Sequence, residues 1–181
     1  RHTRLQGDWS SDVCSSDLPD LDEPNSLHAY QTAERIRQKY PEDKELQVAG
    51  LIHDLGKILF KFGEPSWAVV GDTYALQCEF GKSIVYYNTL PNNEYDKLGK
   101  YEEKCGIDKL LITFGHDEYL YMILKHNKEK HKLSERFWNI IRFHSFYPWH
   151  TGGDYKHFMK EDDDKLMKDV LFFNEFDLYS K

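Results

Sequence analysis

Cysteine is scarce in this sequence. Its 181 residues include three cysteines, Cys14, Cys78 and Cys105, which are odd in number and widely spaced. A disulfide scaffold uses cysteines in larger, paired sets, so this usage argues against one. It predicts reduced thiols and therefore a cytoplasmic protein.

Long apolar runs and basic stripes are also missing. No apolar stretch approaches the roughly 20 residues of a membrane-spanning helix, and the first residues are polar, without the apolar region of a signal peptide. The formal net charge is −7, and the cluster of lysines between Lys125 and Lys132 is interrupted by Glu129. That cluster indicates a solvated helix end. We therefore expect neither a membrane nor a nucleic acid as a partner.

Helical patterning accounts for most of the chain. Apolar residues recur at helical spacing, between plausible start and stop signals, in residues 27–40, 43–55, 116–124, 134–146 and 162–179. Residues 96–105 indicate a polar, partly helical connection, and residues 66–70 are compatible with a short strand between turns. The length suits one domain. The predicted fold is an all-α, single-domain helical bundle.

The first 18 residues stand apart from this pattern. Residues 8–18 match the translation, in one reading frame, of a common sequencing-library adapter oligonucleotide. We therefore expect residues 1–18, Cys14 included, to be non-native and leave them out of the fold prediction. The domain is expected to span residues 19–181.

One stretch, Val48–Lys57, carries the strongest functional signal. His53 and Asp54 stand side by side among apolar residues that predict burial, Leu51, Ile52 and Leu55. An isolated buried charge costs several kcal/mol, and a bound cation removes this penalty because imidazole and carboxylate are metal ligands. Lys57 falls on the same helical face. The stretch predicts a metal site with a cation beside it.

Further ligand-type side chains occur on the other predicted helices. Together with the pair in Val48–Lys57 they fall on five helices, and the set is His28, His53, Asp54, His116, His144 and Asp177. Six such groups suffice for two metal ions with a shared carboxylate. Their nitrogen and oxygen donors, without a thiolate, favour iron or manganese over a structural zinc.

Structural roles remain open for most of these residues when each is considered alone. His116 can be a helix-start residue, His144 can pack against aromatic rings, and Asp177 can be a surface residue. The adjacent pair His53 and Asp54 is the exception, because its setting is apolar. The other histidines have polar or glycine-rich neighbours and are predicted not to be ligands: His2, His126, His131, His150 and His157.

A family resemblance joins these observations. His28, then His53-Asp54, then the distant Asp177 resembles the H…HD…D signature of HD-domain metalloproteins. Longer strings resemble the myo-inositol oxygenase family: residues 24–34, 49–57, 70–72, 115–119, 141–150 and 176–181. An ordinary HD phosphohydrolase is not expected to show the string Phe-His-Ser-Phe-Tyr-Pro-Trp at residues 143–149.

The resemblance implies an HD-domain-like helical bundle with a non-heme di-iron centre. The enzyme would cleave the ring of myo-inositol with dioxygen to give D-glucuronate, in inositol catabolism, with a mixed-valent Fe(II)/Fe(III) pair. Two groups of ligands are implied, one of His28, His53 and Asp177 and one of His116 and His144, with Asp54 as the bridge. A monomer is expected.

The resemblance also implies the substrate contacts. Myo-inositol would be bound by Lys57, Gly71, Asp72, His144 and Ser145. Asp54 and Lys57 would be the catalytic pair, with Lys57 offsetting alkoxide charge on the substrate. A polyol needs such a set of polar groups because a missing hydrogen bond discriminates strongly between substrates.

Two departures from the family shape the expectations. Family segments that touch substrate near the N-terminus align with residues 15–18, inside the adapter-like stretch, and family members continue beyond Lys181. We therefore expect a chain truncated at both ends, which binds iron but has weak or no turnover. The alternatives are a metal-dependent phosphohydrolase of the HD class, for which Lys57 alone gives thin support, and an inactive helical fragment.

Overall fold

Helices dominate residues 25–177, the part of the chain that the computed structural model describes. The longer ones are α1 (Asn25–Lys39), α2 (Lys44–Ile52), α4 (His116–His126), α5 (Glu135–Phe143) and α7 (Asp163–Asp177). The shorter ones are the 3-10 helix η1 (Leu55–Phe62) and the α-helices α3 (Ser66–Val69) and α6 (Tyr147–His150). Short 3-10 turns lie at Tyr87–Thr89, Ile107–Lys109, Lys128–Lys130 and Lys156–Phe158.

Side chains fix where two central helices begin. Asp43 accepts a hydrogen bond from the Leu46 N–H at 2.9 Å at the start of α2. Ser134 does the same for Phe137 at the start of α5, as its position in the sequence predicts. Each cap satisfies a backbone donor that the first helical turn leaves unpaired.

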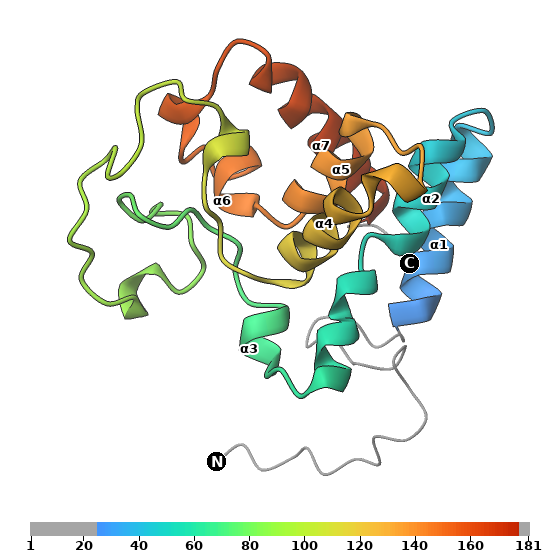
Figure 1. Ribbon diagram of the computed structural model, residues 1–181, viewed down its shortest axis with the longest axis horizontal. Coiled ribbons are helices and arrows are strands. Elements are labelled where there is room, and N and C mark those ends of the chain that lie inside the picture. The colour runs from blue at the N-terminus through green and yellow to red at the C-terminus, as the bar shows by residue number, and fades with distance from the viewer. Residues whose placement is uncertain (1–24, 178–181) are drawn as a thin grey trace.

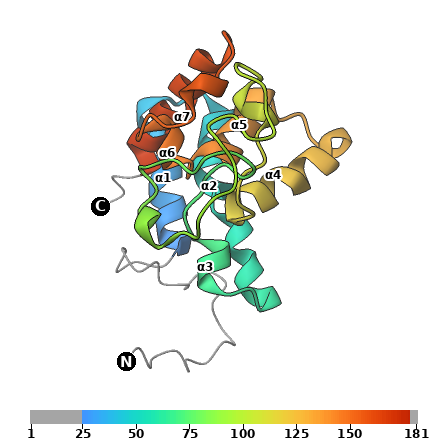
Figure 2. The same cartoon turned by 90° about the vertical axis from the view of Figure 1, so that its left-hand side faces the viewer.

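The five longer helices pack together, and the long connection between α3 and α4 lies to one side of them (Figure 1). α1 packs along α2, α5 contacts α2, α4 and α7, and α7 also contacts α1 and α2. The turned view shows α1, α2, α5 and α7 grouped behind the loops (Figure 2). In the described part of the chain there is no β-strand, only an isolated bridge between Ala75 and Ile112. The predicted all-α fold is therefore confirmed.

Two groups of buried side chains form the core. The first lies among the five longer helices and contains Ile36, Leu46, Ala49, Leu120, Phe137, Ile140, Ile141, Phe173 and Phe176. The second joins α5, α6 and α7 to the long connection and is built on aromatic residues such as Phe143, Phe146, Trp149 and Phe158. Burying an aromatic side chain removes a large apolar area from water. The loops are thus anchored by side-chain packing rather than by a sheet.

The helix predicted for residues 43–55 is wrong at its end. α2 stops at Ile52, and the chain turns at Asp54 (φ −90°, ψ 1°) into η1. In a continued α-helix, the adjacent residues His53 and Asp54 would point in different directions around the helix axis. The turn instead places His53 and Asp54 at a junction between two helices, where both can face the interior.

Two other local predictions are also wrong. The predicted strand at residues 66–70 is instead the helix α3 (Ser66–Val69), because the Pro65 carbonyl accepts hydrogen bonds from Ala68 and Val69 and so closes a helical turn. Residues 96–105 contain turns without a helix. Their backbone groups bond to distant segments, as in Lys100 N–H to the Gln77 carbonyl at 2.9 Å.

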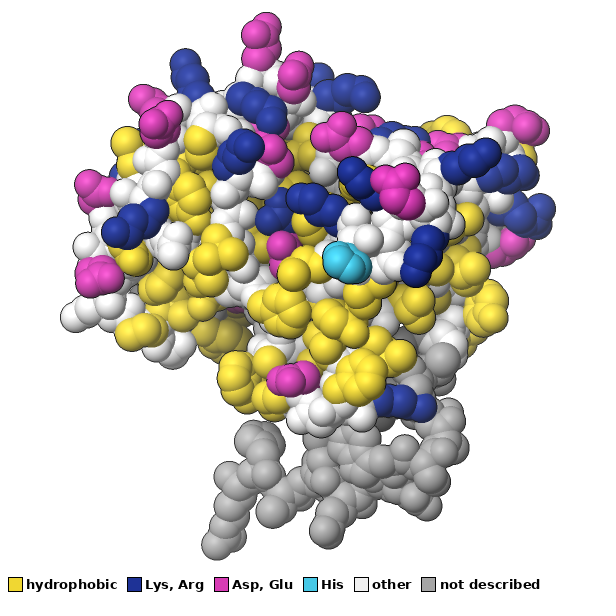
Figure 3. Space-filling model, viewed as in Figure 1, with side chains coloured by type: hydrophobic (Ala, Val, Ile, Leu, Met, Phe, Trp, Pro, Cys, Tyr) yellow, Lys and Arg dark blue, Asp and Glu magenta, His cyan; other side chains and the backbone are white. Residues whose placement is uncertain are grey.

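The surface carries both charge and exposed apolar side chains. On the face seen in Figure 3, hydrophobic side chains gather over the lower part, where η1 and α3 lie, and Phe62 and Trp67 are among the exposed apolar residues of these helices. Of the helices in residues 25–177, none is long and apolar enough to cross a lipid bilayer. The adapter-like residues 1–18 and residues 19–24 and 178–181 of the predicted domain lie outside the described residues.

Candidate metal centre

The structure brings all six sequence-predicted ligands together. They come from α1, from the junction of α2 and η1, from the start of α4 and from the ends of α5 and α7. Their side chains are buried or nearly so, and the set is His28, His53, Asp54, His116, His144 and Asp177.

The burial of His53 does not have the cause that the sequence suggests. Leu51 and Leu55, from which the burial of His53 and Asp54 was predicted, are themselves 42% and 55% exposed. His53 is only 1% exposed because rings from other helices cover it, with Phe173 at 5.4 Å and His144 at 5.2 Å between ring centroids. Tertiary packing, not the local apolar run, removes this imidazole from water.

Three helices direct their C-terminal ends at the cluster. His53 follows the last residue of α2, His144 follows the last residue of α5, and Asp177 is the last residue of α7. The C-terminal end of a helix carries partial negative charge from its unpaired carbonyls. The backbone therefore adds to the attraction of the two carboxylates for a cation.

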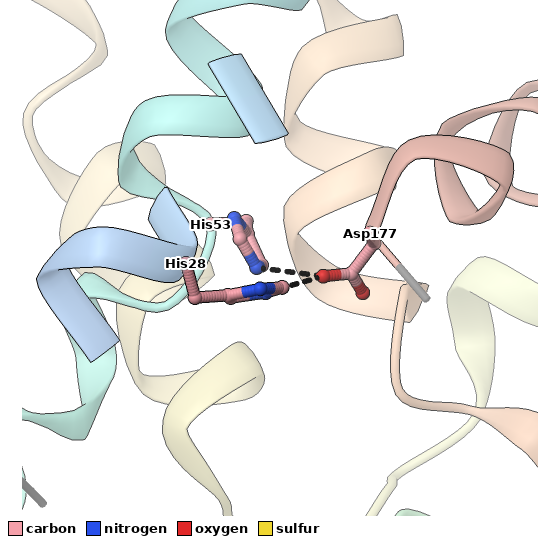
Figure 4. Close-up of side chains that lie close together, drawn as sticks. All are labelled: His28, His53 and Asp177. Carbon is pink, nitrogen blue, oxygen red and sulfur yellow. Dashed lines mark hydrogen bonds and ion pairs between the residues drawn. The ribbon is translucent and has the colours of Figure 1, made fainter. Parts of the chain in front are cut away.

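Asp177 joins two histidines on one side of the cluster. Its Oδ1 atom lies 2.8 Å from Nε2 of His28 and 3.1 Å from Nε2 of His53 (Figure 4). One ligand atom from each of these three residues lies within 4.8 Å of the others. Two imidazole nitrogens and a carboxylate oxygen at such separations can surround one metal ion.

Asp54 faces both halves of the cluster. Its Oδ2 atom is 3.4 Å from Nε2 of His53 and 3.9 Å from Nε2 of His28. Its Oδ1 atom is 3.3 Å from Nε2 of His116 and 3.9 Å from Nε2 of His144. The two oxygens thus face different pairs of histidines, so this carboxylate can contact a cation on either side.

The protonation pattern of three imidazoles suits metal binding. The Nδ1 atoms of His53, His116 and His144 lie 2.8 to 3.0 Å from backbone carbonyl oxygens, which belong to Gly50, Val69 and Ile141, respectively. A carbonyl only accepts, so Nδ1 donates and Nε2 is left as the metal-binding atom.

Two of these nitrogens are very close together. Nε2 of His116 and Nε2 of His144 lie 3.2 Å apart. Two lone pairs at this distance repel unless a proton or a metal ion accepts them. Burial, helped by electrostatic repulsion from the neighbouring imidazoles, lowers the pKa of His144 to about 4 and so disfavours a proton on it. The donor set therefore fits a metal ion.

The remaining pKa shifts follow from the same crowding of charges. Burial lowers the pKa of His53, but the carboxylates of Asp54 and Asp177 outweigh it and raise that pKa to about 9. Burial raises the pKa of Asp54, but His53 and Lys57 outweigh it and hold that pKa well below its usual range. The pKa of Asp177 is lowered in the same way, mainly by His53. Without metal, the carboxylates hold a proton on His53.

Only some of the predicted substrate contacts lie at the cluster. Nζ of Lys57 is 2.6 Å from Oδ2 of Asp54, and Oγ of Ser145 is 3.5 Å from Nε2 of His116. Asp72, next to the exposed Gly71, instead accepts a hydrogen bond from the Val85 N–H at 2.9 Å. The loop that holds Asp72 reaches the centre indirectly, through the bond between His116 and the Val69 carbonyl.

Sequence reasoning missed one buried histidine beside the cluster. His150 is 6% exposed, and its Nε2 lies 3.2 Å from the carbonyl oxygen of His144. It follows Pro148 and Trp149, and these apolar neighbours were the signal in the sequence. Of the other histidines predicted not to be ligands, His126 is exposed, and His131 and His157 hydrogen-bond to backbone carbonyls away from the cluster. His2 lies outside the described residues.

Known proteins similar to this chain are inositol oxygenases. A protein named inositol oxygenase from Danio rerio is 49% identical over 90% of this chain. The one from Rattus norvegicus is 44% identical over 96% of it, and inositol oxygenase 1 from Arabidopsis thaliana is 47% identical over 90% of it. The chain spans between 55% and 63% of the length of these three relatives.

The family assignment rests on a longer match. The sequence model that describes myo-inositol oxygenase matches residues 8–181. This range includes all six residues of the cluster as well as the predicted substrate contacts. The chain belongs to the myo-inositol oxygenase family.

Proposed function

We propose that the cluster holds two iron ions. One would be bound by His28, His53 and Asp177, the other by His116 and His144, with Asp54 bridging them. The observation that carries this proposal is the placement of the two Asp54 oxygens, each facing a different histidine pair. The absence of a thiolate among the six donors favours iron over a structural zinc.

The proposed reaction is the dioxygen-dependent ring cleavage of myo-inositol to D-glucuronate. The names of the family and of the relatives support myo-inositol as the substrate. When bound as a mixed-valent Fe(II)/Fe(III) pair, iron supplies Lewis-acid charge stabilisation, a template for inositol oxygens and the redox chemistry of dioxygen. The alternative of a phosphohydrolase gains no support from these relatives.

The polar side chains around the cluster would bind and orient the polyol. Lys57 donates to Asp54 at 2.6 Å. It would also donate to a substrate oxygen and offset the negative charge that forms on that oxygen when the substrate hydroxyl loses its proton. Ser145 would add a hydrogen bond beside His144. Gly71 would let the loop backbone approach the ring, and Asp72 would accept hydroxyl protons. Asp54 and Lys57 are the proposed catalytic residues.

The proposal extends to the chain's environment. We propose a monomer that works in the cytoplasm and meets myo-inositol and dioxygen there. Cys78 and Cys105 are free thiols, as expected in a reducing compartment. Burial raises the pKa of Cys78 to about 12, so this thiol is protected from the oxidation that follows thiolate formation.

Iron stoichiometry and product analysis test this function. The chain is loaded with Fe(II) under anaerobic conditions, and the iron content per chain and the binding of inositol are measured. Dioxygen uptake and glucuronate formation are then measured after oxygen is admitted. The wild-type chain should hold two irons and bind inositol, and Asp54→Asn should hold one at most. Asp162→Asn, at an exposed aspartate outside the cluster, serves as the control and should match the wild type.

Specific outcomes would overturn the proposal. A wild-type chain that holds fewer than two irons, or an Asp54→Asn variant that holds two, contradicts the bridged pair. Phosphate release from nucleotides without inositol-dependent dioxygen uptake would favour the phosphohydrolase alternative instead.

A further inference from the structure

A buried hydrogen bond links the proposed substrate loop to the start of α4, beside the proposed ligand His116. Thr73 Oγ1 donates to Oδ2 of Asp117 at 2.9 Å. Thr73 is 2% exposed and Asp117 is fully buried. Thr73 follows Asp72, and Asp117 follows His116. Neither has been given a role in the proposed function.

Further bonds hold the same two segments together. Nδ1 of His116 bonds to the Val69 carbonyl at 2.8 Å. The Thr113 hydroxyl donates to the Asp72 carbonyl at 3.0 Å and accepts from the Tyr74 N–H at 3.2 Å. Hydrogen bonds thus hold residues 69–74 against the segment that leads into α4. The Thr73–Asp117 bond joins two side chains, whereas the other bonds each involve a backbone group.

Asp117 is suited to hold a fixed position. Its Oδ1 atom accepts the Glu118 N–H at 2.8 Å, and it lies in the first turn of α4, where the helix carries partial positive charge. A buried carboxylate with fixed donors is costly to move, because losing a donor leaves it unsatisfied. The Asp117 carboxylate is therefore held in place, and its position determines where the Thr73 hydroxyl lies.

We propose that Asp117 is a positioning residue that acts through Thr73 and sets where the Gly71–Asp72 loop stands relative to the metal centre. The inference rests on the proposed function, because it takes Asp72 as a contact to the polyol. Asp117 is neither one of the proposed metal ligands nor one of the proposed substrate contacts. Its loss should weaken inositol binding while the metal stays in place, because none of the six ligand side chains depends on the Thr73 hydroxyl.

The test compares two substitutions of nearly the same size. Thr73→Val removes the hydroxyl and keeps the shape, whereas Thr73→Ser keeps the hydroxyl. In the iron-loaded full chain, Thr73→Val should raise the KM for myo-inositol, or the Kd where turnover is slow, by about 10-fold. Iron per chain and kcat should stay within about twofold of the wild type, and Thr73→Ser should restore the wild-type KM. Asp117→Leu, which is close in size to aspartate and cannot bond to the Thr73 hydroxyl, should weaken inositol binding like Thr73→Val.

The outcomes separate this proposal from the proposed function. A Thr73→Ser chain as weak as Thr73→Val, or a Thr73→Val chain that loses iron or kcat instead of raising KM, overturns the positioning role. If the wild-type chain binds no inositol, the proposed function fails, and amide hydrogen exchange of residues 69–74 decides the positioning role. Faster exchange in Thr73→Val but not in Thr73→Ser upholds it, and equal exchange overturns it.

Discussion

Nζ of Lys57 lies 2.6 Å from Oδ2 of Asp54, and both side chains are less than a tenth exposed. The two residues stand three apart across the start of η1, so the same turn that aims Asp54 at the histidines also brings Lys57 to it. The Lys57 ammonium group is therefore paired with the same carboxylate that faces the histidines of both halves of the cluster. A ligand that recruits Lys57 must compete with that carboxylate.

Replacing Lys57 should separate substrate binding from metal binding. We expect Lys57→Met to hold as much iron as the wild type, because the lysine is not a metal ligand. Its kcat/KM for myo-inositol should fall by about 100-fold, the effect of losing one or two charge-assisted hydrogen bonds. Lys61→Met, at an exposed position of the same helix, is the control and should behave as the wild type. Equal kcat/KM in the two variants would contradict the role of Lys57.

Metal binding should release protons at neutral pH. The pKa of His53 is raised to about 9 in the metal-free chain, so its imidazole is protonated at pH 7 and must lose a proton to bind metal. Calorimetry in buffers of different ionisation enthalpy should show this release. The apparent affinity should rise by about 10-fold per pH unit up to pH 9 and then level off. A binding enthalpy independent of the buffer at pH 7 would contradict the prediction.

The stability of the metal-free chain should depend on pH on both sides of neutrality. The raised pKa of His53 stabilises the fold fully below the ordinary imidazole pKa of 6.5, and this contribution is lost as the pH rises through about 9. The lowered pKa of Asp177 stabilises above the ordinary value of 3.8 and is lost in acid. Thermal unfolding should show the highest Tm between the ordinary pKa values of 3.8 and 6.5. The fall in Tm toward pH 9 should be absent in His53→Gln.

Gly56 should tolerate no side chain. A Cβ at this position would collide with the carbonyl oxygen of His116, a backbone atom that cannot rotate away. We expect Gly56→Ala to cost about 3 kcal/mol of unfolding free energy and to weaken iron binding, because His116 must shift. Gly63→Ala is the control. Its φ of +88° strains an alanine but its surroundings are open, so about 1 kcal/mol should be lost, with iron binding unchanged.

A buried ion pair should stabilise the start of α4. Arg142 contacts Glu118 at 2.6 Å, and its guanidinium also donates to the carbonyls of Asp108 and Leu110. Denaturant unfolding of Arg142→Met should show a loss of about 3 to 5 kcal/mol, because a buried carboxylate is left without its partner. Arg136→Met removes two ion pairs, to Asp43 and Asp169, whose side chains are 23% to 32% exposed, and should cost at most about 1 kcal/mol. Similar losses in both would contradict the burial argument.

By itself, the sequence determined where the five longer helices form and which ligand-type side chains were candidates for the cluster. Hydrogen bonds and apolar periodicity within a helix are local, so the five longer helices could be predicted within a few residues. The six ligand-type residues could be named because imidazole and carboxylate groups on apolar helices are unusual. Local patterns predicted the wrong end for α2 and a strand in place of α3. They did not show that Leu51 and Leu55 are exposed, or that packing from other helices is what buries His53.

Only the tertiary structure decided how the clustered groups face one another. The direction of the Asp54 oxygens depends on how α1, α4, α5 and α7 pack around the turn that follows α2, and the bond between Thr73 and Asp117 joins a loop to α4 across 44 residues of sequence. A side chain at a helix end has no periodic constraint, so long-range packing must orient it. The sequence therefore determined the members of the centre, and the packing of helices determined its geometry.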